Sequence, residues 1–214
     1  MVLSWPPTLP STRTLVIAVA VVIVVALAAL GGWAWYDASH RRTSVAYAEV
    51  MARAQAADAP DTPAEAKAAA AVELEQLLAR YPSARSMPQA AYELGNLRFA
   101  ARNYAGARGA YELALQPGAP GMIRTLARAG IARGWEAERD FAKAADAYGA
   151  LVKELDPKSF AYEDALIDYA RTLELAGKKA EAVAAYQKVL KDVPNARRAD
   201  DIRTRLASLG TATR

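Results

Sequence analysis

The chain has 214 residues, enough for one domain of ordinary size and an appendage. Its 27 basic and 23 acidic residues give a net charge of +4 that is spread along the chain, which indicates a solvated surface and not a nucleic-acid interface. The absence of cysteine excludes a disulfide framework, a thiolate metal site, a cysteine nucleophile and a lipid-modified N-terminal cysteine.

The first predicted element is an apolar segment at residues 15–35, LVIAVAVVIVVALAALGGWAW, which contains no charged residue. As a helix it spans roughly 31 Å, about the hydrocarbon thickness of a bilayer, and a helix satisfies every backbone polar group internally. Trp33, Trp35 and Tyr36 lie at one end, where amphipathic rings favour the membrane interface. We therefore predict an N-terminal tail at 1–14 and a single transmembrane helix at 15–36.

A cleaved signal peptide is the alternative for this segment, because Ala26-Leu27-Ala28 resembles a small-residue cleavage site. The apolar run is longer than the core of about 7–15 residues that is usual in signal peptides, and it continues through the candidate site. We expect an uncleaved helix that is anchored in the lipid bilayer.

Charged residues on both sides of the span bear on its orientation. Arg13 precedes it, and His40, Arg41 and Arg42 follow it, offset by Asp37, so Lys and Arg counts favour a cytoplasmic C-terminal side by a small excess. We interpret the three later residues as interface anchors. Two arginines fall short of the cluster of about four to eight that binds anionic lipid, and no second histidine or cysteine exists to complete a metal site with the lone histidine.

Residues 37–62 are predicted to form a juxtamembrane helix, continuous with the span, and a loop. The sequence TPAE at 62–65 matches a capping box with proline at the first helical position, which predicts a helix from Pro63 to about Arg80. Together with residues 44–57, this helix would make a divergent first repeat at 44–81. Leu74, Leu77 and Leu78 would supply its core face.

Three further helix pairs follow, separated by proline or glycine breakers. They are predicted at residues 86–102 and 104–115, 122–138 and 141–154, and 159–176 and 179–191. A last helix at 195–209, stopped by Gly210 and followed by a tail at 210–214, has few apolar residues, which is typical of a capping helix. An alanine-rich composition with few strand-favouring runs agrees with an all-α fold, a solenoid of about four helix pairs at 63–209.

Three of these pairs align with one another on a tyrosine. Tyr111, Tyr148 and Tyr186 are about 37 or 38 residues apart, and a small residue precedes each by four positions. The small residues let the two helices of a pair approach closely, and the aromatic ring fills the space between one pair and the next. The small residues are Ala107, Ala144 and Ala182.

The best copy, at 94–115, resembles the tetratricopeptide repeat (TPR) family. It contains Leu94-Gly95-Asn96, Asn103-Tyr104, the alanine and tyrosine named above, and Ala114-Leu115. The resemblance covers residues 44–209 and implies a helix–turn–helix solenoid that binds other proteins. The tryptophan that the family often has in the first helix is replaced by Ala91, Arg128 and Leu166.

The layout of the whole chain is similar to a narrower group. A short tail, one membrane helix ending GGWAWYDASHRR and a TPR-like domain resemble the ancillary subunit of the bacterial SecYEG translocon, the YfgM-like proteins. This resemblance implies a single-pass inner-membrane protein with a periplasmic soluble domain that binds a membrane-anchored chaperone. We expect residues 37–214 to be periplasmic on this layout and on the lack of cysteine, against the charge count.

The resemblance also implies a concave groove lined by the first helix of each repeat. Tyr92 and Phe99 are expected to be an exposed aromatic pair there, outside the inter-helix core, and to carry most of the partner affinity. Only Asn96 matches the Lys, Asn and Arg set that grips chaperone C-termini, so no carboxylate clamp is predicted. Carried over residue by residue, the groove residues are Gln89, Tyr92, Asn96 and Phe99, then Arg133 and Glu136, then Asp164, Ile167, Arg171 and Glu174.

No catalytic constellation is found in the sequence. It has no phosphate-binding glycine loop and no nucleophile elbow, and pairs such as Glu73/Glu75, Glu163/Asp164 and Asp200/Asp201 fit surface ion pairing better than acid–base chemistry. We predict no enzyme activity, no cofactor, no metal, no small-molecule substrate and no nucleic acid.

The leading hypothesis is a non-enzymatic, membrane-anchored TPR adaptor whose partners are subunits of a membrane complex or a chaperone. An alternative is a structural accessory subunit of a translocation, respiratory or photosynthetic complex, in which the transmembrane helix itself makes contacts. A third is a regulator of a periplasmic or cell-wall enzyme.

Overall fold

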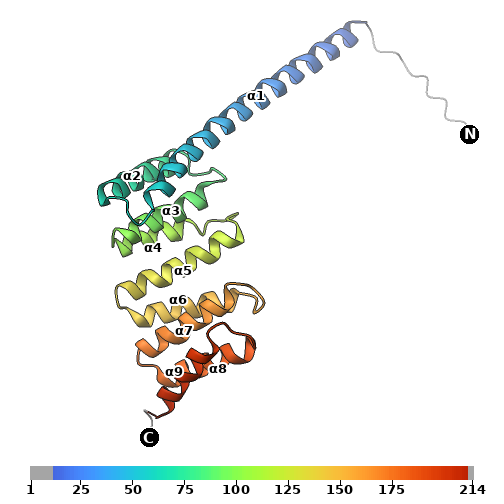
Figure 1. Cartoon of the computed structure of the whole chain (residues 1–214). Helices are drawn as coiled ribbons and strands as arrows, with labels where there is room; N and C mark the ends of the chain where they lie inside the picture. The colour runs from blue at the N-terminus through green and yellow to red at the C-terminus, as the bar shows by residue number, and fades with distance from the viewer. Residues whose placement is uncertain (1–11, 212–214) are drawn as a thin grey trace, which may run out of the picture. The chain divides into compact units, whose positions relative to one another are not determined.

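The computed structural model describes residues 12–211, apart from the side chains of Thr14, Ser39 and His40. Within that range the chain forms nine α-helices and no strand, so the predicted all-α class is confirmed (Figure 1). The chain divides into two compact units after Val45. Of the predicted tails, residues 1–11 and 212–214 lie outside the described range. The helices are α1 (Thr12–Ala57), α2 (Ala64–Arg80), α3 (Met87–Ala100), α4 (Tyr104–Leu113), α5 (Gly121–Ala137), α6 (Phe141–Glu154), α7 (Tyr162–Leu175), α8 (Lys179–Asp192) and α9 (Ala199–Thr211).

The first unit contains most of α1. This helix is long and apolar enough, by length and composition, to cross a membrane, and it is the one such helix in the described part of the chain. It runs without a break from Thr12 to Ala57, as predicted for the continuation of the apolar segment into the juxtamembrane helix. Its apolar side chains are exposed; Val22, for example, is 66% exposed.

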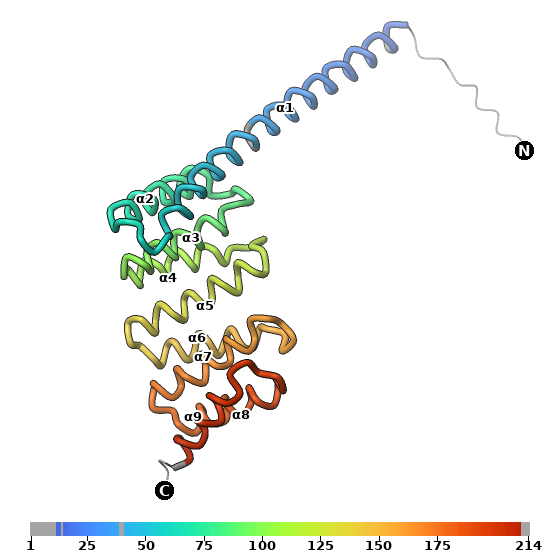
Figure 2. The backbone as a smooth tube through the Cα atoms, viewed as in Figure 1, coloured from blue at the N-terminus to red at the C-terminus, as the bar shows by residue number. Residues whose placement is uncertain are grey.

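The second unit, from Ala46 onward, is built from antiparallel helix pairs. Figure 2 shows the backbone reversing direction between successive helices from α2 to α8. The pairs are the C-terminal end of α1 with α2, then α3 with α4, α5 with α6, and α7 with α8. The described residues therefore contain the four pairs and the final helix that the sequence predicts for a solenoid.

The first pair is joined by contacts between the end of α1 and α2. Tyr47 is 2% exposed, and its hydroxyl donates a hydrogen bond to the Tyr81 carbonyl at 3.0 Å. Arg53 Nε lies 2.7 Å from Glu73 Oε2. The predicted capping box is wrong, because the Thr62 hydroxyl donates to the Ala56 carbonyl at 3.3 Å and no side chain caps α2. That hydroxyl closes the preceding turn instead.

The aligned tyrosines fill the spaces between neighbouring pairs, as the pattern predicts. Tyr111 and Tyr148 are each 1% exposed and Tyr186 is 4% exposed, and the three alanines four residues earlier are fully buried. Tyr111 lies between two glycines of the neighbouring helices: a Cβ on Gly130 would come within 2.6 Å of one edge of its ring, and a Cβ on Gly95 would clash with the other edge. Only glycine permits this approach of α3 and α5 to the ring.

The turns inside the three aligned repeats share one backbone geometry. Arg102, Arg139 and Gly177 occupy equivalent positions after the first helix, with φ of 60°, 63° and 77°. In each turn the amide of the next residue donates to a carbonyl five residues back, as from Asn103 to Arg98 at 2.9 Å. This is the Schellman arrangement that ends helices with a left-handed residue, for which glycine is the usual choice.

The last helix covers the end of the solenoid. Ile202 and Leu209 of α9 are 3% and 7% exposed and belong to the same core cluster as α7 and α8. The helix was predicted to stop at Gly210 but continues to Thr211. A single glycine near a helix end lowers helix propensity by about 1 kcal/mol without preventing helix formation.

Candidate docking groove

The residues predicted to line the groove come from the first helices of the three aligned repeats, α3, α5 and α7. Counted back from each tyrosine, Asn96, Arg133 and Arg171 are equivalent, and so are Phe99 and Glu136. Four of these five side chains, all except Asn96, line one hollow of about 340 Å³. The full lining is Phe99 from α3, Arg133, Glu136 and Ala137 from α5, Tyr148 from α6, and Asp168 and Arg171 from α7. We call this space the central hollow.

One side of the central hollow is held by an ion-pair network between α5 and α7. Arg171 donates to both oxygens of Glu136, at 2.5 and 2.8 Å, and to Asp168 Oδ1 at 3.0 Å. Hydrogen bonds from these carboxylates, Glu136 first, outweigh partial burial and raise the pKa of Arg171 above its usual range. The guanidinium therefore stays charged and satisfies both acids across the repeat boundary.

The wall of the central hollow contains a polar atom with no partner. The Tyr148 side chain is 1% exposed, and its hydroxyl oxygen is buried without a hydrogen bond to any residue that the structure describes. Burial raises the pKa of Tyr148, with a further rise from the negative charge of Asp168. The hydroxyl is therefore neutral at ordinary pH, and a buried oxygen without a hydrogen-bond partner among the described residues is uncommon in folded proteins.

Arg133 is the arginine of the central hollow that forms no ion pair among the described residues. Its side chain is exposed, and no carboxylate of residues 12–211 lies within ion-pair distance of its guanidinium. Its positive charge acts on Tyr148, where it lowers the phenol pKa and partly opposes the effect of burial. The central hollow therefore contains two acids that share Arg171, an exposed arginine without an ion pair, and the buried Tyr148 hydroxyl in its wall.

Tyr92 and Phe99 are not the exposed aromatic pair that the sequence predicts. Both are half-buried against the core cluster that contains Tyr111. The Tyr92 ring centroid is 5.7 Å from that of Tyr111, and the Phe99 centroid is 5.2 Å from that of Tyr104 in an edge-on contact. The expectation that they stand outside the inter-helix core is wrong, because the small residues of α3 and α4 bring these rings into contact. Phe99 still presents one edge to the central hollow.

The other predicted groove residues have different surroundings. Gln89 is exposed at the start of α3. Asn96 accepts the Tyr111 hydroxyl at 2.9 Å and donates to Glu93 at 3.2 Å, so its side chain is used within the fold. Asp164 is exposed and lies 3.1 Å from the Arg197 guanidinium.

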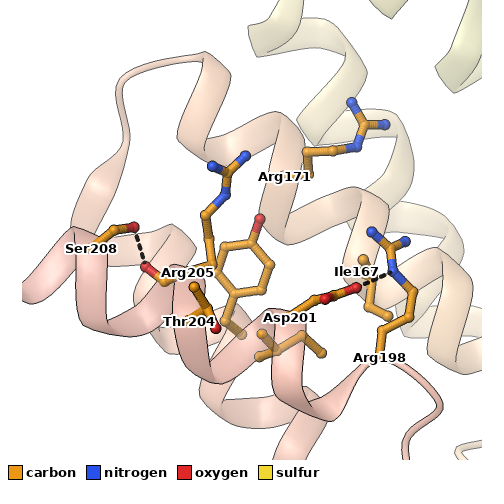
Figure 3. Close-up of a pocket in the computed structure, with 9 residues that line it drawn as sticks. Ile167, Arg171, Arg198, Asp201, Thr204, Arg205 and Ser208 are labelled. Atoms are coloured by element: carbon orange, nitrogen blue, oxygen red, sulfur yellow. Dashed lines mark hydrogen bonds and ion pairs between the residues drawn. The ribbon is translucent and has the colours of Figure 1, made fainter.

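A second hollow, of about 430 Å³, lies among α7, α8 and α9 (Figure 3). Arg171 lines both hollows. Figure 3 marks an ion pair between Arg198 and Asp201, 3.9 Å long. Ile167, predicted as a groove residue, lines this hollow but is only 2% exposed, and Glu174 lies 3.2 Å from Arg205.

Sequence reasoning assigned Tyr148 to the core alone and did not select Asp168. The tyrosine is indeed buried, and it also contributes to the lining of the central hollow. The residue equivalent to Asn96, the partner of Tyr111, is Arg133, which has no acceptor to offer a phenol. This signal is not sufficient, because Arg171 is equivalent in the third repeat and the Tyr186 hydroxyl there donates to Glu174 at 3.3 Å.

The residues predicted at a membrane interface lie along α1. Trp33, Trp35 and Tyr36 are 67%, 75% and 58% exposed. Arg41 pairs with Asp37 one turn earlier, at 2.8 Å, and Arg42 is exposed. The side chain of His40 lies outside the described residues.

Among the described residues, no group of three or more His, Asp or Glu side chains is placed to hold a metal ion. The acidic residues of the central hollow, Glu136 and Asp168, both accept hydrogen bonds from Arg171. The hollow therefore presents a mixture of charged and aromatic side chains.

Comparison with known families identifies the class of protein. The tetratricopeptide repeat-like domain family matches residues 11–211, which is nearly the whole chain, so the chain belongs to that family. No curated protein matches it significantly. Domains of this kind mediate protein–protein interactions and are typically non-enzymatic scaffolds.

Proposed function

We propose that this protein is a non-enzymatic, membrane-anchored TPR adaptor that docks a partner protein in the groove formed by α3, α5 and α7. The observation that carries the proposal is the central hollow, where residues from three repeats converge. A hollow lined by several repeats is a surface that only the stacked solenoid presents to a partner.

Anchoring is proposed to occur through α1, retained in the mature protein as a single pass of the bacterial inner membrane. The support is the uninterrupted apolar run and the family match, which includes this segment together with the repeats. N-terminal sequencing of the mature protein that begins near Ala29 would contradict retention and favour a cleaved signal peptide.

The soluble unit is proposed to lie in the periplasm, with chaperones or subunits of a membrane complex as partners. The layout that resembles the YfgM-like proteins supports this orientation. A cysteine placed at Gln116, which is exposed in the loop before α5, should react with a membrane-impermeant thiol reagent in intact spheroplasts. Labelling that occurs only after lysis would reverse the orientation.

A structural accessory subunit of a translocation, respiratory or photosynthetic complex is the second candidate, since the apolar side chains of α1 are exposed over the whole span. In that case α1 would make the main contacts. Regulation of a periplasmic or cell-wall enzyme remains a third candidate, in which docking in the groove would modulate a hydrolase.

Site-specific photocrosslinking in cells separates groove docking from contacts through α1. A photoreactive residue at Ala137, which lines the central hollow without forming its polar contacts, should give discrete protein adducts. The same residue at Glu112, exposed on α4 and remote from the hollow lining, should not. Adducts from a position such as Val22 on α1, with none from Ala137, would favour the accessory subunit.

A further inference from the structure

We propose that the second unit contains a hinge between α5 and α6, about which residues 46–137 and residues 141–211 move as two halves. The ion pair between Arg171 and Glu136 is the latch that holds the hinge closed. Opening or closing the hinge changes the width of the central hollow. The hinge goes beyond the proposed function, because it is a movement of the solenoid itself and requires no partner.

The apolar core of the second unit consists of two separate clusters. The first extends from the end of α1 to α4 and includes Ala127 of α5, with Ile131 packed against it. The second begins with Ala145 of α6 and continues to α9, and from α5 only Ala129 packs against it. The two clusters therefore meet between α5 and α6, which is inside a helix pair and not between two pairs.

The first helix of this pair buries no large side chain of its own. The buried residues of α5 are all alanine or glycine: Ala127, Gly130, Ala132 and Gly134. The equivalent helices α3 and α7 bury leucines such as Leu94 and Leu166. The aligned tyrosine is common to all three pairs, so the difference lies in the first helix. Because apolar burial is the main term that holds helices together, α5 and α6 resist separation less than the helices of the other two pairs.

Ion pairs cross the boundary between the two halves. Arg171 of α7 donates to both carboxylate oxygens of Glu136, at 2.5 and 2.8 Å, and Arg128 of α5 pairs with Glu154 of α6. All four side chains are partly exposed. When such a pair separates, water solvates both charges, whereas separation of an apolar core exposes it to water. These contacts can therefore open and form again at a small cost in free energy.

The central hollow lies across the same boundary. The residues that line it come from both halves: Phe99, Arg133, Glu136 and Ala137 from the first, and Tyr148, Asp168 and Arg171 from the second. A close-packed interior resists displacement, because any movement makes atoms overlap. A hollow of about 340 Å³ at the boundary gives the two halves room to rotate.

The preceding boundary, between α3 and α5, has no such room. The Tyr111 ring lies between Gly95 and Gly130, and α3 and α5 approach each other closely there. Around the next aligned tyrosine the equivalent residues are Ala132 and Ile167. Their larger side chains keep α7 from approaching α5 in the same way. The freedom to move is therefore confined to one boundary of the aligned repeats.

Hydrogen exchange of the full-length protein in mild detergent, followed by mass spectrometry of its peptides, tests the hinge. Leu94→Ala, in the first core cluster, should speed exchange of the protected amides of α3 and α4 about tenfold or more, and that of α7 and α8 less than about threefold. Leu166→Ala is the matched variant in the second cluster and should do the reverse. Amides of α5 should follow α3 and α4, and amides of α6 should follow α7 and α8.

Pairs of spin labels test the latch, since the chain has no cysteine of its own. Cysteines at Glu112 of α4 and Gln187 of α8, both exposed, report the distance across the hinge. Cysteines at Gln76 of α2 and Glu112 report a distance within the first half. Glu136→Gln should broaden the distribution of distances across the hinge and leave the other unchanged, because an amide does not form the charge-assisted pair.

Glu75→Gln is the matched control for the latch. It removes an ion pair of the same kind, with Arg98 at 2.7 Å, but that pair lies within the first half. This substitution should change neither distance distribution. A broadening across the hinge as large as that of Glu136→Gln would show that loss of any surface ion pair has this effect, and would overturn the latch.

Two further outcomes would contradict the proposal. If α5 and α6 respond together to each leucine variant, the boundary is not inside their pair and the hinge is overturned. If the distance distribution across the hinge is as narrow in Glu136→Gln as in the wild type, the ion pair is not the latch. Neither measurement includes a partner, so both results leave groove docking standing, which crosslinking at Ala137 tests separately.

Discussion

The repeat formed by α3 and α4 and the repeat formed by α5 and α6 place a tyrosine in the same position and treat its hydroxyl in opposite ways. Tyr111 and Tyr148 are equally buried, at 1% exposure. The first donates a hydrogen bond to Asn96 at 2.9 Å, while the second has no partner among the described residues. The position equivalent to the acceptor Asn96 is Arg133 in the second repeat and Arg171 in the third, where the Tyr186 hydroxyl donates to Glu174 at 3.3 Å instead.

Tyr111 and Tyr148 occupy the same place in their repeats, but only the Tyr111 hydroxyl is hydrogen-bonded within the fold. In the α3–α4 repeat the ring and its hydroxyl are both used by the fold, and burial raises the pKa of Tyr111 to about 12. In the α5–α6 repeat the ring fills the same space, but the hydroxyl has no hydrogen-bond partner among the described residues. Positions where a local rule is broken inside a regular fold are where function is expected.

Removing the aromatic ring of either Tyr111 or Tyr148 should have the largest effect on stability. Tyr111→Ala and Tyr148→Ala should each lower the free energy of unfolding by about 3 kcal/mol or more, because each leaves a large cavity between two helix pairs. Denaturant unfolding of the full-length protein in detergent, followed by circular dichroism, measures both. A loss below about 1 kcal/mol at either position would show that the two rings are not equivalent core elements.

Substitution of a glycine that packs against the Tyr111 ring should have the next largest effect on stability. Gly130→Ala places a methyl group against the ring and should cost about 1–3 kcal/mol. Gly109→Ala, on the exposed side of α4 with no atom near its added Cβ, should instead stabilise by up to about 1 kcal/mol through helix propensity. Equal effects of the two substitutions would contradict the packing described for α3, α4 and α5.

Removing only the hydroxyls tests the comparison directly. Tyr111→Phe should cost about 1 kcal/mol, because it leaves the partly buried Asn96 oxygen without its donor. Tyr148→Phe should cost nothing or should stabilise, because it removes a buried hydroxyl that has no partner. The denaturant midpoints of the two variants measure the difference. A cost at Tyr148 as large as that at Tyr111 would mean that its hydroxyl is satisfied within the fold.

The smallest expected effect on stability comes from substitutions in the turns between the two helices of each repeat. Arg102→Gly and Arg139→Gly should each stabilise by a few tenths to about 1 kcal/mol, because glycine adopts a positive φ without the steric cost that an L side chain meets. Gly177→Ala is the matched control and should destabilise by a similar amount. Thermal unfolding of the three variants ranks them. A loss of stability in both glycine variants would show that the arginine side chains contribute more than the strain they impose.

Much of the fold could be predicted from local pattern. The spacing of the alanines and tyrosines, together with proline and glycine breakers, located the helix pairs, and the tyrosines are buried where the pattern places them. The helix ends were predicted less well. The TPAE capping box does not form, and α9 passes through Gly210, because single-residue signals at helix ends compete with alternative hydrogen bonds and with packing.

The candidate site could be predicted only in outline. The repeat register selected Phe99, Arg133, Glu136 and Arg171 for one groove, and the structure gathers them in the central hollow. Register does not reveal how deeply a side chain is buried, so Tyr92 and Phe99 were expected to be exposed and Ile167 was expected to offer contact area. Each is covered because the neighbouring helix contributes small residues or another ring.

The sequence by itself determined the helical period, the pairing of successive helices, the burial of the aligned tyrosines and the presence of one apolar segment long enough to span a membrane, because these depend on residue spacing along the chain. Only the tertiary structure decided which polar groups are satisfied. Arg171 meets Glu136 across 35 positions of sequence, and Tyr148 meets no acceptor. Hydrogen bonds between repeats depend on distances of a few ångströms between separate helices, and those distances are set by packing and not by periodicity.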